Sequence, residues 1–432
     1  MREMKNSGVA WIGDIPENWK VLRNKNLIYE INEKCTDTTD LPLLSVSEYY
    51  GVAPRADKIH DGQIVSRAET FEGYKICHQD DVVMNIMLAW KRAQAVSSFN
   101  GIVSPAYCVY RKKNNSKLDM TFFNYLIRSD LYISVFKRFS TGIIDSRLRL
   151  YPEKFLALHS HVPPTYEQHK IAKHLNKACN NIENLINNQE QQIEKLKQYK
   201  QSLITEVVTK GLNPDVPMKD SGIEWIGIIS AIHNIYRLKY LLNSQMLYGA
   251  NEAGSFYTNN AVRYIRITDI TEDNKLKDSA ENLYLSIEKA KPYILKDKDV
   301  LFARSGATVG KAFMYLNEYG KSAFAGYLIK AECNMQKLLP EYLFYYTQSS
   351  LYEYWKNMIF IQATIQNIGA NKYSNMPIIQ MSIDEQNQIV KFLDDKCAKI
   401  NRLIAIKQEK IDKLNDYKKS LIYEYVTGKK EA

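Results

Sequence analysis

The feature that most constrains this chain is an internal duplication. The opening segment Ser7-Gly8…Trp11-Ile12-Gly13 recurs in the second half of the chain as Ser221-Gly222…Trp225-Ile226-Gly227. A longer segment, 167–209, recurs as 385–427, and 20 of its 43 aligned positions are identical. Because a repeat of this kind indicates repeated structural units, the fold must be built from two copies of one plan.

Both copies of the longer segment have the pattern of a long helix. Apolar residues step by four and three through each copy, as in the seam of a coiled coil. A helix of about 43 residues would span roughly 65 Å and could not bury such a seam alone. We therefore expect the two helices to pair, antiparallel if a pseudo-twofold axis relates the halves, although each could instead pack on its own domain. The apolar seam residues are Ile182, Ile186, Ile193, Leu196, Leu203, Ile400, Ile404, Ile411, Leu414 and Leu421, and the polar ones are Gln189, Lys200, Lys407 and Lys418.

The regions between these helices, 17–162 and 230–376, have a different texture and share little sequence. Both mix helical stretches, at 121–129 and 340–349, with short β-like runs that Gly, Asn and Asp separate. Repeated flanks around divergent cores indicate one scaffold that presents two different binding surfaces. The β-like runs include 43–46, 81–84, 106–110, 264–267 and 299–302.

These observations predict an α+β fold with an internal tandem duplication and pseudo-twofold symmetry. Mixed α/β domains are expected at 1–163 and 213–378. Long, antiparallel coiled-coil helices at 164–212 and 379–432 are expected to separate them.

Composition points to a polyanionic partner and a reducing compartment. The formal net charge is +10 and the isoelectric point about 9.0, which favours nucleic acid without proving it. The six cysteines form no close pair, so neither a zinc site nor a redox motif is predicted. No apolar run resembles a signal peptide or reaches the length of a membrane span, and we expect a cytoplasmic protein.

Two motifs resemble catalytic ones and lack what the chemistry requires. Val162-Pro163-Pro164-Thr165-Tyr166 resembles the Asn/Asp-Pro-Pro-Tyr motif of adenine methyltransferases, but Val162 cannot accept hydrogen bonds from a target amine. Its prolines more simply precede a helix for which Thr165 could be the N-cap. Gly306–Ala312 resembles a phosphate-binding P-loop but is one residue short between its glycines and lacks the hydroxyl that would hold magnesium. That turn could still hold a DNA phosphate through backbone N–H groups and cations, or be a tight solvated hairpin.

The duplicated helices and the Trp-Ile-Gly openings resemble the specificity (S) subunits of type I restriction–modification enzymes. Trp11–Trp19 is similar to the usual start of the first target-recognition domain of that family. In the second opening, Ser230 and His233 stand where Pro and Trp are usual. Asp80–Tyr107 and Asp299–Gly306 are similar to core segments of such domains, and the resemblance covers essentially the whole chain.

The resemblance implies a non-catalytic subunit that binds double-stranded DNA. Each target-recognition domain would contact one half of a split DNA site, and the helix pair would separate the domains. Two modification (methyltransferase) subunits carrying S-adenosylmethionine would dock on the chain and methylate adenine. Two restriction (translocase and nuclease) subunits, using ATP and Mg²⁺, would supply DNA cleavage. No cofactor and no metal is expected in this chain.

Candidate DNA-contacting residues follow from the chemistry of the duplex. Lys and Arg neutralise phosphates, whereas Arg favours guanine edges and Asn or Gln favours adenine. In the first domain we select Lys91, Arg92, Thr141, Arg147 and Arg149. In the second we select Arg263, Arg266, Arg304, Ser305, Thr308, Lys311, Gln366, Asn367 and Lys372.

Two other classes of function compete with this interpretation. A self-contained DNA methyltransferase or nuclease would bind S-adenosylmethionine or transfer methyl groups when purified without partners. A coiled-coil scaffold that never meets DNA would lack neighbouring genes for a methyltransferase and a helicase-like nuclease.

Overall fold

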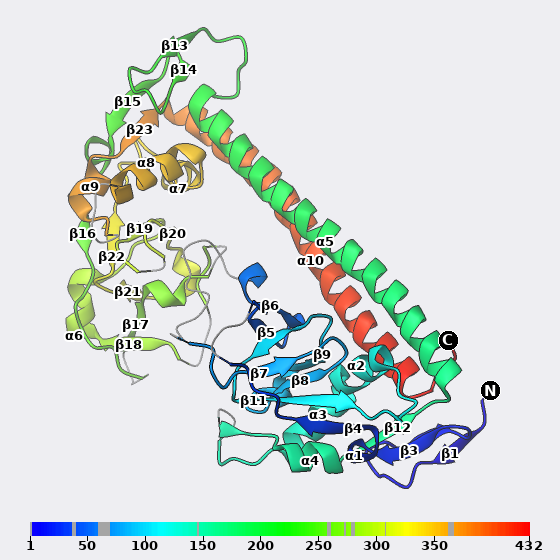
Figure 1. Cartoon of the computed structure of the whole chain (residues 1–432). Coiled ribbons are helices and arrows are strands. Elements are labelled where there is room, and N and C mark those ends of the chain that lie inside the picture. Colours follow the sequence, from blue (N-terminus) through cyan, green and yellow to red (C-terminus); the bar gives the residue numbers. More distant parts are fainter. Residues whose placement is uncertain are drawn as a thin grey trace. The chain divides into compact units, whose positions relative to one another are not determined.

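The structure, a computed structural model, divides into two units. Unit 1 consists of Met1–Gln189 and Glu409–Ala432, and unit 2 of Glu190–Gln408. The long helices α5 (Thr165–Lys210) and α10 (Ile383–Val426) each contribute one part to unit 1 and the other to unit 2 (Figure 1). The residues described are 2–36, 40–58, 70–144, 147–256, 261–271, 274–277, 281–306, 308–361 and 367–432.

Unit 1 is a mixed α/β domain whose central sheet has the strand order β4-β11-β8-β9, with antiparallel neighbours throughout. Besides parts of α5 and α10, its elements are β1 (Met4–Asn6), β2 (Asp14–Pro16), β3 (Lys20–Arg23), α1 (Asn24–Leu27), β4 (Ile28–Ile31), β5 (Leu44–Ser47), β6 (Gly51–Pro54), η1 (Ala56–Lys58), β7 (Lys75–Cys77), β8 (Val82–Asn85), η2 (Ala89–Lys91), β9 (Gln94–Val96), β10 (Gly101–Val103), β11 (Tyr107–Lys112), α2 (Met120–Arg128), α3 (Asp130–Phe139), α4 (Pro152–Ala157) and β12 (His159–Val162).

Unit 2 repeats this plan, with a central antiparallel sheet in the order β16-β22-β19-β20. Its elements are β13 (Met218–Asp220), β14 (Ile228–Ser230), β15 (Asn234–Arg237), η4 (Leu238–Leu241), β16 (Leu247–Tyr248), β17 (Ala261–Ile265), η5 (Ile267–Asp269), β18 (Leu283–Ser286), α6 (Ile287–Ala290), η6 (Lys291–Tyr293), β19 (Val300–Ala303), β20 (Ala312–Met314), η7 (Asn317–Tyr319), β21 (Ser322–Phe324), β22 (Leu328–Ala331), α7 (Pro340–Tyr346), α8 (Ser350–Ile361), α9 (Ala370–Ser374) and β23 (Pro377–Gln380).

Each central sheet is buried on both faces. In unit 1, Val82 and Met84 of β8 pack into the core that includes α2 and α3, while Val83 packs into the core that includes β5 and β6. In unit 2, Val300 and Phe302 of β19 likewise face the core of α7 and α8, and Leu301 faces the other core. Because successive side chains of a strand point to opposite faces, continuous apolar runs suit strands buried in this way.

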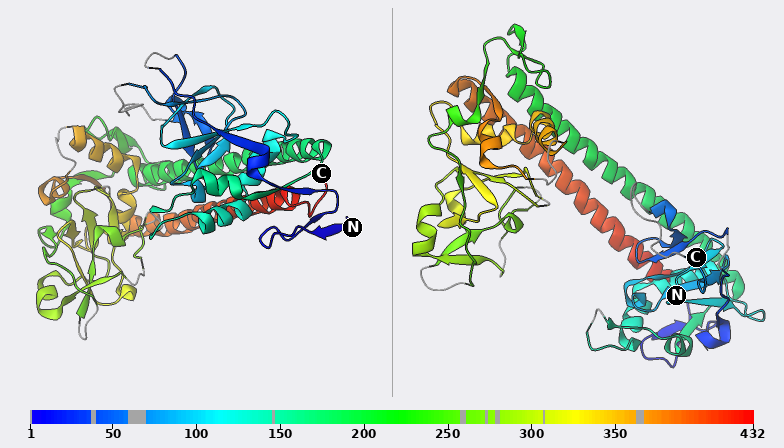
Figure 2. Two further views of the ribbon diagram at one scale, coloured as in Figure 1. Left: turned by 60° about the horizontal axis from the view of Figure 1, so that its bottom comes forward. Right: turned by 60° about the vertical axis from the view of Figure 1, so that its left-hand side comes forward.

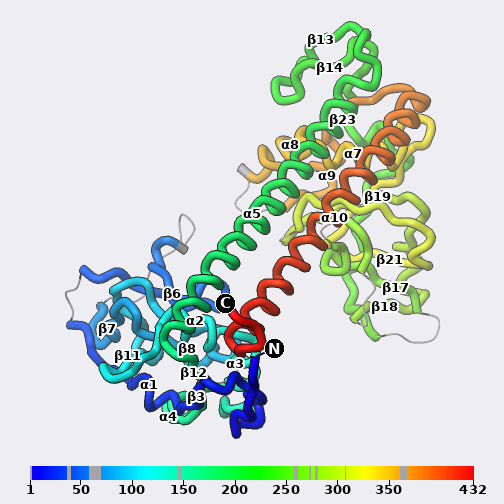
Figure 3. Tube along the Cα trace, turned by 90° about the vertical axis from the view of Figure 1, so that its right-hand side faces the viewer, coloured from blue at the N-terminus to red at the C-terminus, as the bar shows by residue number. Residues whose placement is uncertain are grey.

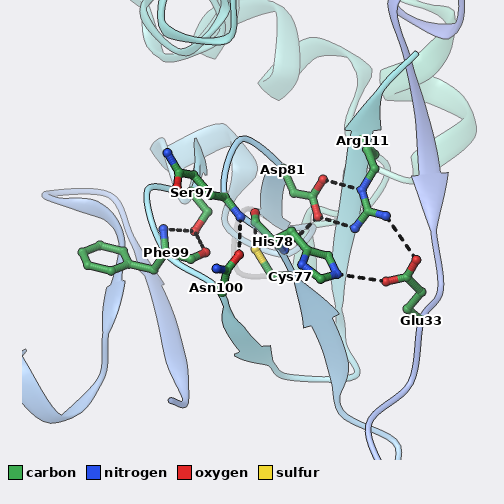
Figure 4. A network of polar contacts seen from close by, with 9 residues as sticks. Glu33, Cys77, His78, Asp81, Ser97, Phe99, Asn100 and Arg111 are labelled. Carbon is green, nitrogen blue, oxygen red and sulfur yellow. Dashed lines mark hydrogen bonds and ion pairs between the residues drawn. The ribbon is translucent and has the colours of Figure 1, made fainter. Parts of the chain in front are cut away.

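The two divergent domains share a turn that their sequences do not make obvious. Asp81 and Asp299 directly precede the equivalent strands β8 and β19, and both are buried. Each carboxylate accepts the backbone N–H of the third residue before it at 2.9 Å. Figure 4 shows this network in unit 1, where Arg111 donates two hydrogen bonds of 2.9 Å to Asp81. These hydrogen bonds raise the pKa of Arg111. In unit 2, Lys330 lies 3.4 Å from Asp299.

This turn also explains where the predicted strands begin. The runs at 43–46, 81–84, 106–110 and 299–302 form β5, β8, β11 and β19, and each strand begins one residue later than predicted. At 81 and 299 the reason is that the aspartate caps the preceding turn. The run predicted at 264–267 begins and ends too late, because β17 ends at Ile265 and a 3-10 turn follows.

The predicted long helices pair antiparallel within each unit (Figures 1, 2 and 3). In unit 1, Lys418 of α10 donates to Glu183 of α5 at 2.5 Å. In unit 2, Lys200 of α5 donates to Asn401 of α10 at 3.1 Å, and Lys407 contacts Gln192. Three of the four polar seam residues thus make hydrogen bonds across the helix pair. Ile182, Ile193, Ile400, Ile411 and Leu421 are buried, and Ile186, Leu196, Leu203, Ile404 and Leu414 are half-buried.

Both helices also pack on the globular part of each unit. The core of unit 1 includes Ile171 and Leu175 near the start of α5, together with Leu421 and Val426 near the end of α10. The core of unit 2 includes the opposite portions of the same two helices. Each helix therefore pairs with the other and packs on the globular cores.

The repeated Glu-Gln pair at the start of each long helix fixes the helix to its domain. Gln168 Oε1 accepts the N–H of Asp119 at 2.7 Å, and Gln386 Oε1 accepts that of Leu339 at 2.8 Å. The preceding Glu167 accepts the indole N–H of Trp19 at 3.1 Å. The N–H groups of Glu167 and Gln168 donate to the carbonyl of Pro164, so Pro164 is the N-cap residue of α5 and Thr165 is its first helical residue. The predicted N-cap role of Thr165 is therefore wrong.

The unusual second opening keeps this contact with a different side chain. His233 occupies the position in the second opening that Trp19 occupies in the first, and its Nε2 is 2.9 Å from Glu385 Oε1. Both His233 and Trp19 are buried. The histidine therefore reaches the helix glutamate from the same position as the tryptophan, which explains how the unit tolerates the exchange.

His161 links β12 of unit 1 to the end of α10. Its ring stacks on Trp19, with 5.8 Å between ring centroids, and its Nε2 donates to the carbonyl of Val426 at 2.8 Å. Nδ1 is buried without a partner among the described residues. Burial lowers the pKa of His161 to about 4, because a charged ring would lose its hydration there.

We predict that His161 makes unit 1 sensitive to mild acid. Its folded pKa lies below the unfolded value of about 6.5, so its contribution is intact above about pH 6.5 and is lost progressively as the pH falls from there to about 4. From pH 7 to pH 5 this costs about 2 kcal/mol of unfolding free energy. Urea unfolding followed by tryptophan fluorescence should show a shallower pH dependence for His161→Gln than for wild type. His174→Gln, at an exposed ring, should keep the wild-type dependence.

Candidate nucleic-acid interface

Two equivalent loops hold six of the fourteen predicted DNA-contacting residues. The loop 86–93 joins β8 to β9, and the loop 304–311 joins β19 to β20 with the same number of residues. Arg92 (φ 66°) and Gly310 (φ 84°) occupy the same position in the two loops, and both take the left-handed conformation. The N–H of Leu150 donates to the carbonyl of Ile86 at 2.9 Å, just as that of Ile368 donates to Arg304 at 2.8 Å.

In unit 1 this loop presents an aromatic ring that lies close to two cations. Lys91 Nζ lies 5.0 Å and Lys137 Nζ 5.1 Å from the ring centroid of Trp90. Lys91 is exposed. Arg92, by contrast, forms an ion pair with Asp130 and donates to the carbonyl of Arg128 at 3.2 Å, and burial lowers its pKa. Lys91 is therefore available at the surface, whereas Arg92 holds the loop in place.

The remaining candidates of unit 1 lie on the segment beside this loop. Thr141 and Arg149 form an antiparallel backbone bridge with hydrogen bonds of 2.9 and 3.0 Å. The N–H of Arg147 donates to the carbonyl of Ile144. Since Leu150 bonds to Ile86, Arg149 is held next to the β8–β9 loop. Asn367 takes the equivalent position in unit 2, directly before Ile368.

In unit 2 the β19–β20 loop contains polar atoms without partners. Arg304 Nε and Thr308 Oγ1 are buried and make no hydrogen bond among the described residues. Ser305 forms a backbone bridge with Asn367, which is exposed. Lys372 is exposed on α9, while Gln366 lies outside the described residues.

Three backbone amides of this loop are engaged inside the hairpin. The N–H groups of Val309, Gly310 and Lys311 donate to the carbonyls of Gly306, Ala303 and Thr308, respectively, at 2.9–3.0 Å. These three amides are therefore not free to hold a phosphate, and a phosphate contact through other amides of the loop stays a prediction.

Arg263 lies on β17 of a separate sheet, β18-β17-β21, and Arg266 directly follows that strand. Arg266 makes two side-chain hydrogen bonds to Asp269, at 3.1 and 2.8 Å, which raise its pKa. Arg263 donates to the carbonyl of Lys277 and, at 3.3 Å, to Asn282. Both guanidinium groups are thus engaged within unit 2, and their contact with DNA stays a prediction.

Sequence reasoning missed Tyr248, on the short strand β16. Its ring centroid lies 5.0 Å from the guanidinium carbon of Arg304, and its hydroxyl accepts the N–H of Ala370 at 2.9 Å. The contact of Tyr248 with Arg304 arises from the pairing of β16 with β22, which brings the ring to the loop. No sequence motif around Leu247-Tyr248 indicates this contact.

The described residues contain no group of three or more His, Cys, Asp or Glu that could hold a metal ion. All six cysteines are buried and free, and burial raises the pKa of Cys77 to about 12 and of Cys108 to about 11. None of the helices in the described part is long and apolar enough to cross a membrane.

Comparison with known proteins agrees with this architecture. Residues 239–416 match the type I restriction modification DNA specificity domain. The chain is 24% identical to the type I restriction enzyme MjaVIII specificity subunit of Methanocaldococcus jannaschii, over 96% of this chain and 93% of that relative. A chain from a study of complex assembly and conformational transition of the type I R-M system has a TM-score of 0.70 at 16% identity, covering 95% of this chain and 98% of its own length. The HsdS subunit from Thermoanaerobacter tengcongensis matches at 16% identity and a TM-score of 0.46, over 96% of this chain and 98% of its own length.

The duplicated sheet and loop and the paired long helices define a protein built from two homologous units. Residues 239–416 thus resemble a type I restriction modification DNA specificity domain, and nearly the whole chain is similar to a type I restriction enzyme specificity subunit.

We predict that the double variant Arg304→Ala, Lys311→Ala weakens DNA binding. Loss of phosphate contacts would weaken all sequences alike and lower the slope of log affinity against log salt by about 1 for each contact. Loss of a base contact would cost about 1–3 kcal/mol at one position. Titration of duplex DNA across a salt series measures both effects. Affinity equal to wild type at every salt concentration would show that both side chains are merely solvated.

Proposed function

We propose that this chain recognises a bipartite DNA sequence, with each unit contacting one half-site. The observation that carries this proposal is the repeated loop: one backbone plan occurs in both units with different side chains. Ile86, Trp90 and Lys91 in unit 1 stand where Arg304, Thr308 and Val309 stand in unit 2. Two surfaces of the same shape but different chemistry suit the recognition of two different half-sites.

We further propose that the chain docks two modification subunits and, through the assembled complex, two restriction subunits. S-adenosylmethionine would belong to the modification subunits, and ATP and Mg²⁺ to the restriction subunits. Their activity would be adenine methylation or DNA cleavage at the site that this chain selects. Support for a partner that binds twice comes from the surface of the paired helices.

Some residues that are identical in the two copies of the helix are exposed, and the helix pairing does not require them. Leu185 and its repeat Leu403 are 47% and 48% exposed, and Tyr199 and its repeat Tyr417 are 58% and 56% exposed. Each directly precedes a seam residue, so all four lie along the edge of the seam. Exposed aromatic and aliphatic residues of this kind are typical of contacts with a partner protein.

The helix register groups these residues by unit. In unit 1, the ion pair of Glu183 with Lys418 puts Leu185 and Tyr417 at the same level of the helix pair. In unit 2, the hydrogen bond of Lys200 with Asn401 does the same for Tyr199 and Leu403. Each unit therefore offers one Leu–Tyr surface, and we propose that one modification subunit binds at each.

Exchange of one domain should test the division of the site. When residues 230–376 are replaced by the equivalent segment of another family member, one half of the methylated motif should change and the other should remain. The chimera is co-expressed with the modification subunit, and methylated adenines are mapped by sequencing. A folded, active chimera in which both halves change would contradict independent reading. The reciprocal exchange of residues 17–162 should alter the other half.

Charge substitutions on the helices should test the docking surfaces. Leu185→Lys with Tyr417→Lys should remove one modification subunit, and Tyr199→Lys with Leu403→Lys should remove the other, because a buried apolar contact is replaced by a charge. We expect affinity at the altered surface to fall at least about tenfold, as for a residue that dominates an interface. Native mass spectrometry would count the bound subunits. The control, Gln191→Lys with Glu409→Lys, changes exposed repeat-equivalent positions away from the seam and should keep both subunits.

A further inference from the structure

Arg304 differs from Arg92 and Arg266 because its guanidinium has no acidic partner among the described residues. Arg92 pairs with Asp130 and Arg266 with Asp269, whereas among the described residues Arg304 makes no ion pair and no side-chain hydrogen bond. Its Nε is buried without a partner, and the side chain as a whole is half-buried. The guanidinium thus carries two further parallel donors, the Nη nitrogens, that no described residue engages.

The backbone of Arg304 is fixed from both sides. Its N–H donates to the carbonyl of Tyr327 at 3.0 Å, and its carbonyl accepts the N–H of Ile368 at 2.8 Å. The next residue, Ser305, forms a backbone bridge with Asn367. These contacts come from neighbouring segments of unit 2, so the start of the side chain cannot shift without disturbing them.

Tyr248 fixes the other end of the side chain. Its ring lies against the guanidinium, with 5.0 Å from the ring centroid to Cζ, and its hydroxyl accepts the N–H of Ala370 at 2.9 Å. Strand pairing of Tyr248 with Ile329 holds the backbone that carries the ring. A planar guanidinium stacked on an aromatic ring keeps its charge and loses rotational freedom.

A fixed, planar pair of donors suits a ligand with two acceptors in one plane. Guanine offers such a pair, O6 and N7, on its major-groove edge, and bidentate contact from Arg is the most frequent specific pairing. A phosphate also accepts two hydrogen bonds, but it is equally served by a mobile cation such as an exposed lysine. The platform of Tyr248 therefore favours base reading over simple charge neutralisation.

We infer that Arg304 reads a guanine in the half-site of unit 2, and that Tyr248 is the positioning residue that holds its guanidinium for this contact. The inference rests on the proposed function, since it assumes that the unit meets duplex DNA. The equivalent position in unit 1 is Ile86, which has no hydrogen-bond donor in its side chain. This guanine contact is consequently specific to one half of the site.

The test is a selection experiment on a randomised duplex DNA library. The full chain is purified with its modification subunit, bound fragments are sequenced, and the preference for each base is measured at every position. The variants are Arg304→Lys, which keeps the charge but not the planar fork, Tyr248→Leu, which removes the ring, and Tyr248→Phe, which keeps it. Lys91→Ala, in the equivalent loop of unit 1, is the control. Thermal melting establishes that each variant is folded.

Wild type should select a guanine at one position of the unit 2 half-site, by about 5- to 150-fold over other bases. Arg304→Lys and Tyr248→Leu should lose that preference and leave the other positions unchanged, whereas Tyr248→Phe should retain most of it. Lys91→Ala should leave this guanine preference intact. Substitution of that guanine by 7-deazaguanine, which lacks the N7 acceptor, should weaken wild type but not Arg304→Lys.

Other outcomes separate the inference from the function on which it rests. A motif that is unchanged in Arg304→Lys overturns the inference while leaving bipartite recognition in place. A uniform loss of affinity, with every base preference retained, assigns Arg304 to a phosphate and likewise overturns it. If Tyr248→Leu unfolds, the Arg304→Lys result and the 7-deazaguanine result decide the matter. If wild type selects no bipartite motif, the proposed function fails first.

Discussion

The fold depends on the apolar seam that both long helices carry. A helix of α5's length with such a seam needs a partner, and the duplication supplies one within the same chain. Because the two helices pair antiparallel, the start of each lies beside the end of the other. Each unit therefore buries Leu175 or its repeat Leu393, near the start of one helix, in the same core as the last turns of the other helix. Neither copy of the repeat makes a complete unit by itself.

The connection between helix and domain is repeated with different side chains. Gln168 and Gln386 make the same buried hydrogen bonds at the start of α5 and α10, so the helices leave both domains through equivalent contacts. Trp19 and His233 show that the repeat keeps a hydrogen bond rather than a residue type. The glutamates that they contact need a donor, and either an indole or an imidazole N–H can supply one.

The two domains likewise keep one backbone plan with different side chains at the candidate interface. Asp81 and Asp299 fix one end of the central strands, and the loops at the other end share their length and their left-handed residue. Buried carboxylates fix the start of each strand and backbone hydrogen bonds maintain the shape of the loop after it, which leaves the exposed side chains of the loop free to differ. In this way one chain can carry two recognition surfaces of unlike chemistry on one scaffold.

The sequence by itself determined the duplication, the long helices and their seam, because identity at a fixed spacing and a four–three apolar pattern depend only on the order of residues. It also located the starts of β5, β8, β11 and β19 to within one residue. Only the tertiary structure decided which candidates are available to a ligand. The sequence offers Arg92, Arg266 and Arg304 alike as candidates. In the folded chain Arg92 pairs with Asp130 and Arg266 with Asp269, whereas the ring of Tyr248 lies against Arg304. Asp269 is only three residues from Arg266, but Asp130 and Tyr248 come to Arg92 and Arg304 by loop packing and strand pairing across distant parts of the chain, which no local pattern records.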